Sequence, residues 1–203
     1  MILSYEKKLL FIHVPRTGGT SLRDFLLGNF DNDGGDFWQH TSLEYFQRES
    51  GINLGDYFKF ALVRNPWDRF VSLFSLFSKY DATGEYRNFE EVLVRLTVDR
   101  QKTPRLYQQA VNQLELLEDR AGNVDLDFLG RFEDYRTDID KALMHLGMAP
   151  PVLARLNAVG RPHYSTFYTA ETREIIAEYC RPDIEYFDYA FETPESQYED
   201  PAR

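Results

Sequence analysis

The fold is decided by residues 8–27, which read KLLFIHVPRTGGTSLRDFLL. The apolar run over residues 8–14 predicts a strand buried on both faces, as in a parallel sheet. Residues 21–27 place leucine and phenylalanine at helical spacing, which predicts a helix. Residues 15–20 between them form a glycine turn. This order of strand, turn and helix is typical of an α/β fold that binds an anion at the start of the helix.

The same alternation continues along the chain. A second apolar strand is predicted over residues 58–64. The pair Asn65-Pro66 is typical of a helix start, and this helix is expected to end near Tyr80. We expect further helices over residues 42–49, 88–98, 104–119, 135–146 and 170–180, and a short strand over 128–132. The pattern predicts an α/β protein with a P-loop-like three-layer fold, in which helices flank a central parallel sheet.

Composition limits the class of protein. With 203 residues, of which 43% are hydrophobic, a single domain is expected over residues 1–191, followed by an acidic, flexible tail over 192–203. The net charge of −10 argues against nucleic-acid binding, which needs a positive surface. No segment is predicted to cross a membrane, and Cys180 has no partner for an internal disulfide. We therefore expect a cytoplasmic protein, and the oligomeric state is left open.

The glycine turn differs from the loop of nucleoside-triphosphate enzymes, which ends in Gly-Lys-Ser/Thr. Gly19 stands where that lysine is expected, and the cationic side chain of the turn is Arg16 instead. The second strand ends in Arg64, where a magnesium-dependent phosphotransferase has a carboxylate. We therefore expect side chains, and no metal, to neutralise a bound anion. A simple tight turn that needs glycine's conformational freedom is the alternative.

A second anion site is predicted near the first. Arg64 is expected at the carboxyl end of its strand, and Ser72 about two turns into the following helix. Ligands of open parallel sheets bind beyond the carboxyl ends of the strands, so both side chains are expected at the edge where Arg16 lies. Two such sites suit a ligand with two separated phosphate-like groups.

These two segments resemble the motifs of sulfotransferases that use 3′-phosphoadenylyl sulfate (PAPS). Residues 14–21, VPRTGGTS, resemble the loop for the 5′-phosphosulfate, and residues 64–72, RNPWDRFVS, resemble the 3′-phosphate motif. The similarity is to carbohydrate sulfotransferases, including the heparan sulfate 2-O and 6-O branches, and extends weakly to residues 128–135 and 163–168. It implies an enzyme that transfers a sulfuryl group from PAPS to an acceptor hydroxyl and releases adenosine 3′,5′-bisphosphate (PAP).

The resemblance also implies roles for individual residues. Arg16 would contact the transferring group; many members have lysine there, whereas arginine stabilises negative charge but does not readily donate a proton. Arg64 and Ser72 would bind the 3′-phosphate, and Arg161 is a further candidate for nucleotide binding. The 5′-phosphate would be held by the residues that close the loop and open the helix, namely Thr17, Gly18, Gly19, Thr20 and Ser21.

Transfer to a hydroxyl needs a base within reach of the acceptor oxygen. The stretch His40-Thr-Ser-Leu-Glu-Tyr45 resembles the segment that carries a histidine base in the heparan sulfate 6-O branch. His40 is therefore the expected general base, with an ordinary loop histidine as the alternative. His13 is expected to be structural. His145, near a helix C-terminus, is expected either to compensate the helix dipole or to lie on the surface. His163 is expected either to contact a ligand or to lie in a surface turn.

Two other classes of function remain open at this point. A P-loop kinase or another nucleoside triphosphatase is disfavoured by the absent lysine and carboxylate. A nucleotide-binding protein without catalysis is compatible with arginine at position 16. The expected acceptor is a small molecule or a carbohydrate with a hydroxyl group, and no sequence motif specifies it further.

Overall fold

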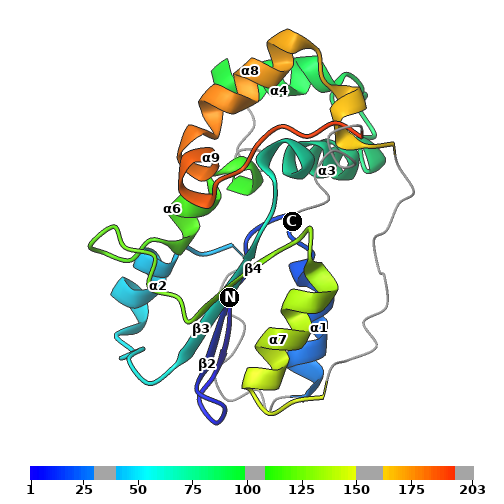
Figure 1. Cartoon of the computed structure of the whole chain (residues 1–203). Helices are drawn as coiled ribbons and strands as arrows, with labels where there is room; N and C mark the ends of the chain where they lie inside the picture. The colour runs from blue at the N-terminus through cyan, green and yellow to red at the C-terminus, as the bar shows by residue number, and fades with distance from the viewer. Residues whose placement is uncertain (30–39, 99–107, 150–161, 195–203) are drawn as a thin grey trace. The chain divides into compact units, whose positions relative to one another are not determined.

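The computed structural model describes residues 1–29, 40–98, 108–149 and 162–194 (Figure 1). The chain divides into two compact units. The first comprises Met1–Arg64 and Gln113–Ala158, and the second comprises Asn65–Asn112 and Val159–Arg203. Each unit is described by itself. The single domain expected over residues 1–191 stays a prediction, and most of the expected tail lies outside the described residues.

The first unit is built on a four-stranded sheet in the order β1-β2-β3-β4. Strands β2, β3 and β4 are parallel, as predicted, whereas β1 pairs antiparallel with β2 and was not foreseen. A three-residue strand is too short to show a periodic pattern, so only its pairing with β2 reveals it. The strands span Ile2–Ser4 (β1), Leu9–Ile12 (β2), Phe58–Val63 (β3) and Phe128–Arg131 (β4).

Helices lie on both sides of this sheet (Figure 1). Helices α1 (Gly19–Asn29) and α7 (Tyr135–His145) cover one side, and α2 (Leu43–Ser50) lies on the other. A short helix, α6 (Gln113–Leu117), packs against α2. The side of α1 and α7 is sealed by a buried apolar cluster that includes Leu9, Phe11, Phe60, Leu62, Leu22, Leu26, Ile139 and Leu143. The expected α/β class, with a mostly parallel sheet, is confirmed.

The second unit is helical and rich in aromatic side chains. Helix α3 begins as predicted, because the side chain of Asn65 accepts a hydrogen bond from the Trp67 N–H. Phe191, near the C-terminal end of the described chain, packs edge-on against Trp67. The helices of this unit span Pro66–Lys79 (α3), Phe89–Val98 (α4), Ala170–Tyr179 (α8) and Arg181–Phe187 (α9), with a 3₁₀ turn, η1, at Tyr164–Phe167.

The helix expected over residues 104–119 is not continuous. Residues 104–107 lie outside the described part of the chain, 108–110 are helical, and the helix is interrupted before α6 begins at Gln113. The carbonyl oxygens of Gln109 and Val111 accept hydrogen bonds from the buried Arg69 guanidinium. This tertiary contact is absent from the local pattern, which is why the sequence predicted one longer helix.

Within the described ranges, no helix has the length and apolar character needed to cross a bilayer.

Candidate active site

The glycine turn connects β2 to α1, as expected. Its backbone adopts left-handed conformations at Arg16 (φ 68°) and Gly18 (φ 78°), and Gly19 is the first residue of α1. The hydroxyl of Thr17 donates a hydrogen bond of 2.9 Å to the Val14 carbonyl oxygen and so braces the turn internally. No acidic residue lies in the first turn of α1. The positive end of this helix dipole is therefore not neutralised from within its own first turn, which favours an anion.

Two aromatic side chains hold the glycines of the turn in place. A Cβ atom at Gly19 would lie 2.2 Å from Cδ2 of His13, and one at Gly18 would lie 2.6 Å from Cε2 of Tyr135. The Tyr135 hydroxyl also donates a 2.9 Å hydrogen bond to the Gly18 carbonyl oxygen. Gly18 is thus required by its conformation and Gly19 by close packing. The tight-turn interpretation and the anion-site interpretation are therefore both compatible with this loop.

Two arginines meet beside the turn. Nη1 of Arg64 donates a 2.9 Å hydrogen bond to the Arg16 carbonyl oxygen, and the Arg64 guanidinium lies 3.8 Å above the centre of the Phe132 ring. Burial, together with the positive charge of Arg64, lowers the pKa of Arg16 to about 10. The Arg16 guanidinium therefore remains charged at neutral pH. An anion bound there would offset the repulsion between Arg16 and Arg64 and the desolvation of Arg16.

The main chain of Arg64 is fixed by a residue that the sequence analysis missed. Gln113, which is fully buried, accepts a 2.9 Å hydrogen bond from the Arg64 N–H and donates one of 2.9 Å to the Arg64 carbonyl oxygen. No motif marks a glutamine in this role. Phe132 and Tyr135, by contrast, lie in the segment 128–135 that already resembled the sulfotransferases.

His40 lies beside the end of β2. Its Nδ1 is 3.1 Å from the carbonyl oxygen of His13, and the two imidazole rings are 4.8 Å apart in an edge-on arrangement. Because a carbonyl oxygen only accepts hydrogen bonds, Nδ1 of His40 must carry a proton. In the neutral ring the basic nitrogen is then Nε2. A general base requires such an unprotonated nitrogen to accept the proton of its substrate.

A comparison with protein families finds that residues 1–190 match the model of the sulfotransferase family. The chain belongs to the sulfotransferase family. Comparison with curated proteins gives no match. Comparison with solved structures gives none either. The assignment accords with the resemblance of both sequence motifs and shows a transferase, while the heparan sulfate 2-O or 6-O subtype is not resolved by it.

The remaining residues predicted for the sulfotransferase site are placed as follows. Thr20 is exposed and Ser21 half-buried, both in the first turn of α1. Ser72 is buried in α3 of the second unit, whereas Arg64 belongs to the first, so their joint 3′-phosphate site stays a prediction. Arg161 lies outside the described residues.

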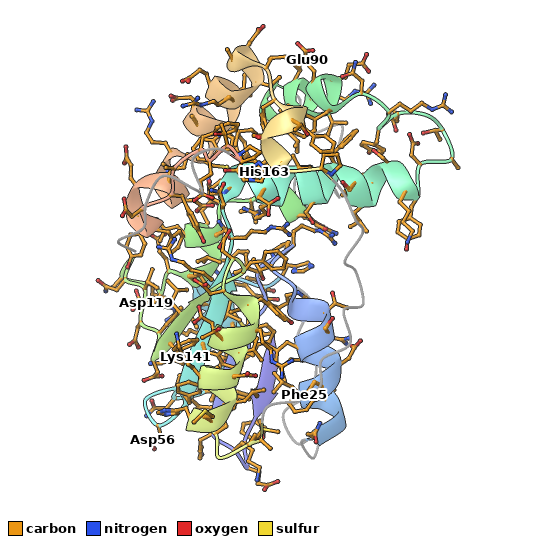
Figure 2. All side chains as sticks on the ribbon, turned by 45° about the vertical axis from the view of Figure 1, so that its right-hand side comes forward. Phe25, Asp56, Glu90, Asp119, Lys141 and His163 are labelled. Atoms are coloured by element: carbon orange, nitrogen blue, oxygen red, sulfur yellow. The ribbon has the colours of Figure 1, made fainter. Side chains whose placement is uncertain are left out.

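The other histidines have structural surroundings in this sulfotransferase. His163, labelled in Figure 2, caps η1: its Nδ1 accepts a hydrogen bond from the Ser165 N–H. His145 stacks on Phe58 with ring centres 4.1 Å apart. In the parts of the chain that the structure describes, no cluster of three or more His, Cys, Asp or Glu side chains is arranged to hold a metal ion.

Substituting Gly19→Ala tests the close packing of the turn. The new methyl group would overlap the buried His13 ring, so we expect a loss of about 1–3 kcal/mol in the free energy of unfolding. Gly28→Ala is the matched control, because it lies in the same helix with nothing within 4 Å of the added carbon. We expect it to be neutral or to gain up to about 1 kcal/mol. Denaturant unfolding of the two variants measures the difference, and equal stabilities would contradict this packing.

Proposed function

We propose that this sulfotransferase uses PAPS as donor and transfers its sulfuryl group to an acceptor hydroxyl beside the turn between β2 and α1. The observation that carries the proposal is the hydrogen bond between His40 and the His13 carbonyl oxygen. Because the carbonyl oxygen only accepts, this hydrogen bond places the proton of the neutral ring on Nδ1 and leaves Nε2 as the basic nitrogen near the anion-binding turn. The order of β2, turn and α1 further supports a P-loop-like arrangement of the donor site.

The donor side rests on positive groups of the protein itself. The 5′-phosphosulfate would lie at the start of α1, held by residues 17–21, with Arg16 against the bridging oxygen. Arg64 would bind the 3′-phosphate together with Ser72, and Arg161 is a further candidate for this role. The arginine that follows β3, where a magnesium enzyme has a carboxylate, supports transfer without a metal.

The acceptor side needs one proton transfer. His40 would remove the acceptor hydroxyl proton through Nε2 while that oxygen attacks sulfur. A new S–O bond forms as the bond between sulfur and the bridging phosphate oxygen breaks. The electron pair of that bond leaves with PAP, and Arg16 would stabilise the added negative charge without giving up a proton. Attack in line with the leaving oxygen requires the acceptor oxygen, beside the base, and the bridging oxygen, held by the loop, to lie on opposite sides of the sulfur atom.

The acceptor is proposed to be a small or weakly charged molecule with a hydroxyl group, carbohydrates included. The net charge of −10 disfavours a highly sulfated polymer, whose charges would be repelled over a large surface. The anionic donor would still bind, because Arg16 and Arg64 provide a local positive site for it.

Calorimetric titration tests the donor assignment directly. We expect PAP to bind without magnesium and ATP not to bind, because the loop lacks the lysine and the strand-end carboxylate of the triphosphate enzymes. Magnesium-dependent ATP binding would favour a phosphotransferase instead. A panel of sugars, lipids and phenols with labelled PAPS then tests catalysis, and PAP binding with no transfer to any of them would favour a non-catalytic binding protein.

A further inference from the structure

His13 is a buried titratable residue that has no role in the proposed sulfuryl transfer. It follows β2 directly, and only 6% of its surface is exposed. Its ring stacks on Phe11, with ring centres 5.8 Å apart, and meets His40 edge-on. The sequence predicted a satisfied structural histidine. Its Nδ1, however, is buried and has no hydrogen-bond partner among the described residues.

Burial is the main reason why this ring is neutral. Desolvation, with smaller contributions from His40, the N-terminal amino group and two arginines, lowers the pKa of His13 to about 3. A neutral imidazole carries one proton, on either Nδ1 or Nε2. On Nδ1 the proton would be a buried donor without an acceptor, which is unfavourable.

The other edge of the ring faces the anion-binding turn. A Cβ atom at Gly19 would lie 2.2 Å from Cδ2 and 2.4 Å from Nε2 of His13. Nε2 therefore lies against the first residue of α1, where the helix dipole favours negative charge. A proton on Nε2 finds an acceptor there as soon as an anion is bound.

We propose that His13 is a ligand-binding residue, whose neutral Nε2–H donates a hydrogen bond to an oxygen of the phosphate-like group bound at the start of α1. The identity of that group as the 5′-phosphosulfate rests on the proposed function. The assignment gives the two adjacent histidines different tasks. His13 donates a proton in a hydrogen bond to the donor molecule, and His40 accepts a proton from the acceptor.

The experiment compares His13→Phe with His13→Gln. Phenylalanine keeps a ring against Phe11 and Gly19 but removes the N–H, whereas glutamine keeps an N–H at a similar reach. We expect His13→Phe to weaken PAP binding by about 10- to 100-fold in calorimetric titration, the range of a hydrogen bond to a charged group. We expect His13→Gln to recover most of that loss. Binding of adenosine 3′-monophosphate, which lacks the 5′-phosphate, should change by less than about 3-fold in either variant.

His145→Phe is the matched control, because it also removes a histidine that stacks on a phenylalanine of the same unit. It should leave PAP affinity unchanged. Equal PAP affinities of the wild type and His13→Phe would overturn the proposal, as would an equal loss for the 3′-monophosphate, which would indicate a general structural defect.

A nitrogen-15 NMR experiment on the imidazole rings separates this proposal from the proposed function. We expect the His13 Nε2–H resonance to shift when inorganic pyrophosphate is added. If it shifts with pyrophosphate while PAP does not bind, the PAPS assignment fails and the role of His13 stands. If neither pyrophosphate nor PAP shifts it, the role of His13 is wrong.

Discussion

Replacing His40 with alanine should slow sulfuryl transfer by orders of magnitude and leave PAP binding intact. The proposed base contributes to the step in which the acceptor hydroxyl loses its proton, and contributes nothing to the contacts of the 3′- and 5′-phosphates. General-base catalysis typically accelerates a reaction by about 10²- to 10⁴-fold, so a loss of kcat in this range is expected. Initial rates with labelled PAPS, together with calorimetric titration of PAP, measure the two quantities separately.

His40→Asn provides the sharper control for that experiment. Its side-chain amide N–H can still donate to the His13 carbonyl oxygen, but it has no basic nitrogen. The local structure should therefore persist while transfer is lost as in the alanine variant. Near wild-type turnover in His40→Asn would show that the histidine is a positioning residue and that another group is the base.

Replacing Arg64 with alanine should chiefly weaken nucleotide binding. The change removes a guanidinium proposed to contact the 3′-phosphate, and it also removes the hydrogen bond that holds the Arg16 carbonyl oxygen. A charge-assisted contact is worth about 1.5–3 kcal/mol, which corresponds to a rise of roughly 10- to 150-fold in the Kd for PAP. Calorimetric titration measures it.

Two further variants define what Arg64 contributes. Arg64→Lys keeps the charge but loses the planar fork over the Phe132 ring, so an intermediate affinity is expected. Arg48→Ala is the control for the loss of one positive charge, because Arg48 pairs with Glu44 and Glu49 on the exposed surface of α2. Its affinity for PAP should equal that of the wild type. An unchanged affinity in Arg64→Ala would remove this residue from the 3′-phosphate site.

Much of the architecture was predictable because it is locally encoded. The apolar run before the glycine turn, and the helical spacing after it, are complete within twenty residues of sequence, and β2 and α1 form there. The Asn65-Pro66 pair likewise begins α3 through contacts within two residues. Such features depend on periodicity, capping and turn chemistry, which neighbouring residues alone supply.

Most of the parts that were missed depend on contacts between segments that are far apart along the chain. The interruption before α6 and the hydrogen bonds between Gln113 and Arg64 each need a partner far away along the chain. The pairing of β1 with β2 was missed for another reason, because β1 has too few residues to show a pattern. The family resemblance identified the motifs that contain the charged residues, and the match to the family model supports that resemblance. Neither the resemblance nor the match identifies the buried Gln113 as a structural support of Arg64.

The sequence by itself determined the order of strand, turn and helix, the family, and the cationic side chains available for an anion. Only the tertiary structure decided that His13 and His40 meet, that Nδ1 of His40 faces a carbonyl oxygen whereas the buried Nδ1 of His13 has no hydrogen-bond partner among the described residues, and that Gly19 is required by the ring packed against it. The reason is physical. Local propensity depends on nearest neighbours along the chain, whereas the protonation of a side chain depends on burial and on hydrogen-bond partners that only the folded chain brings together.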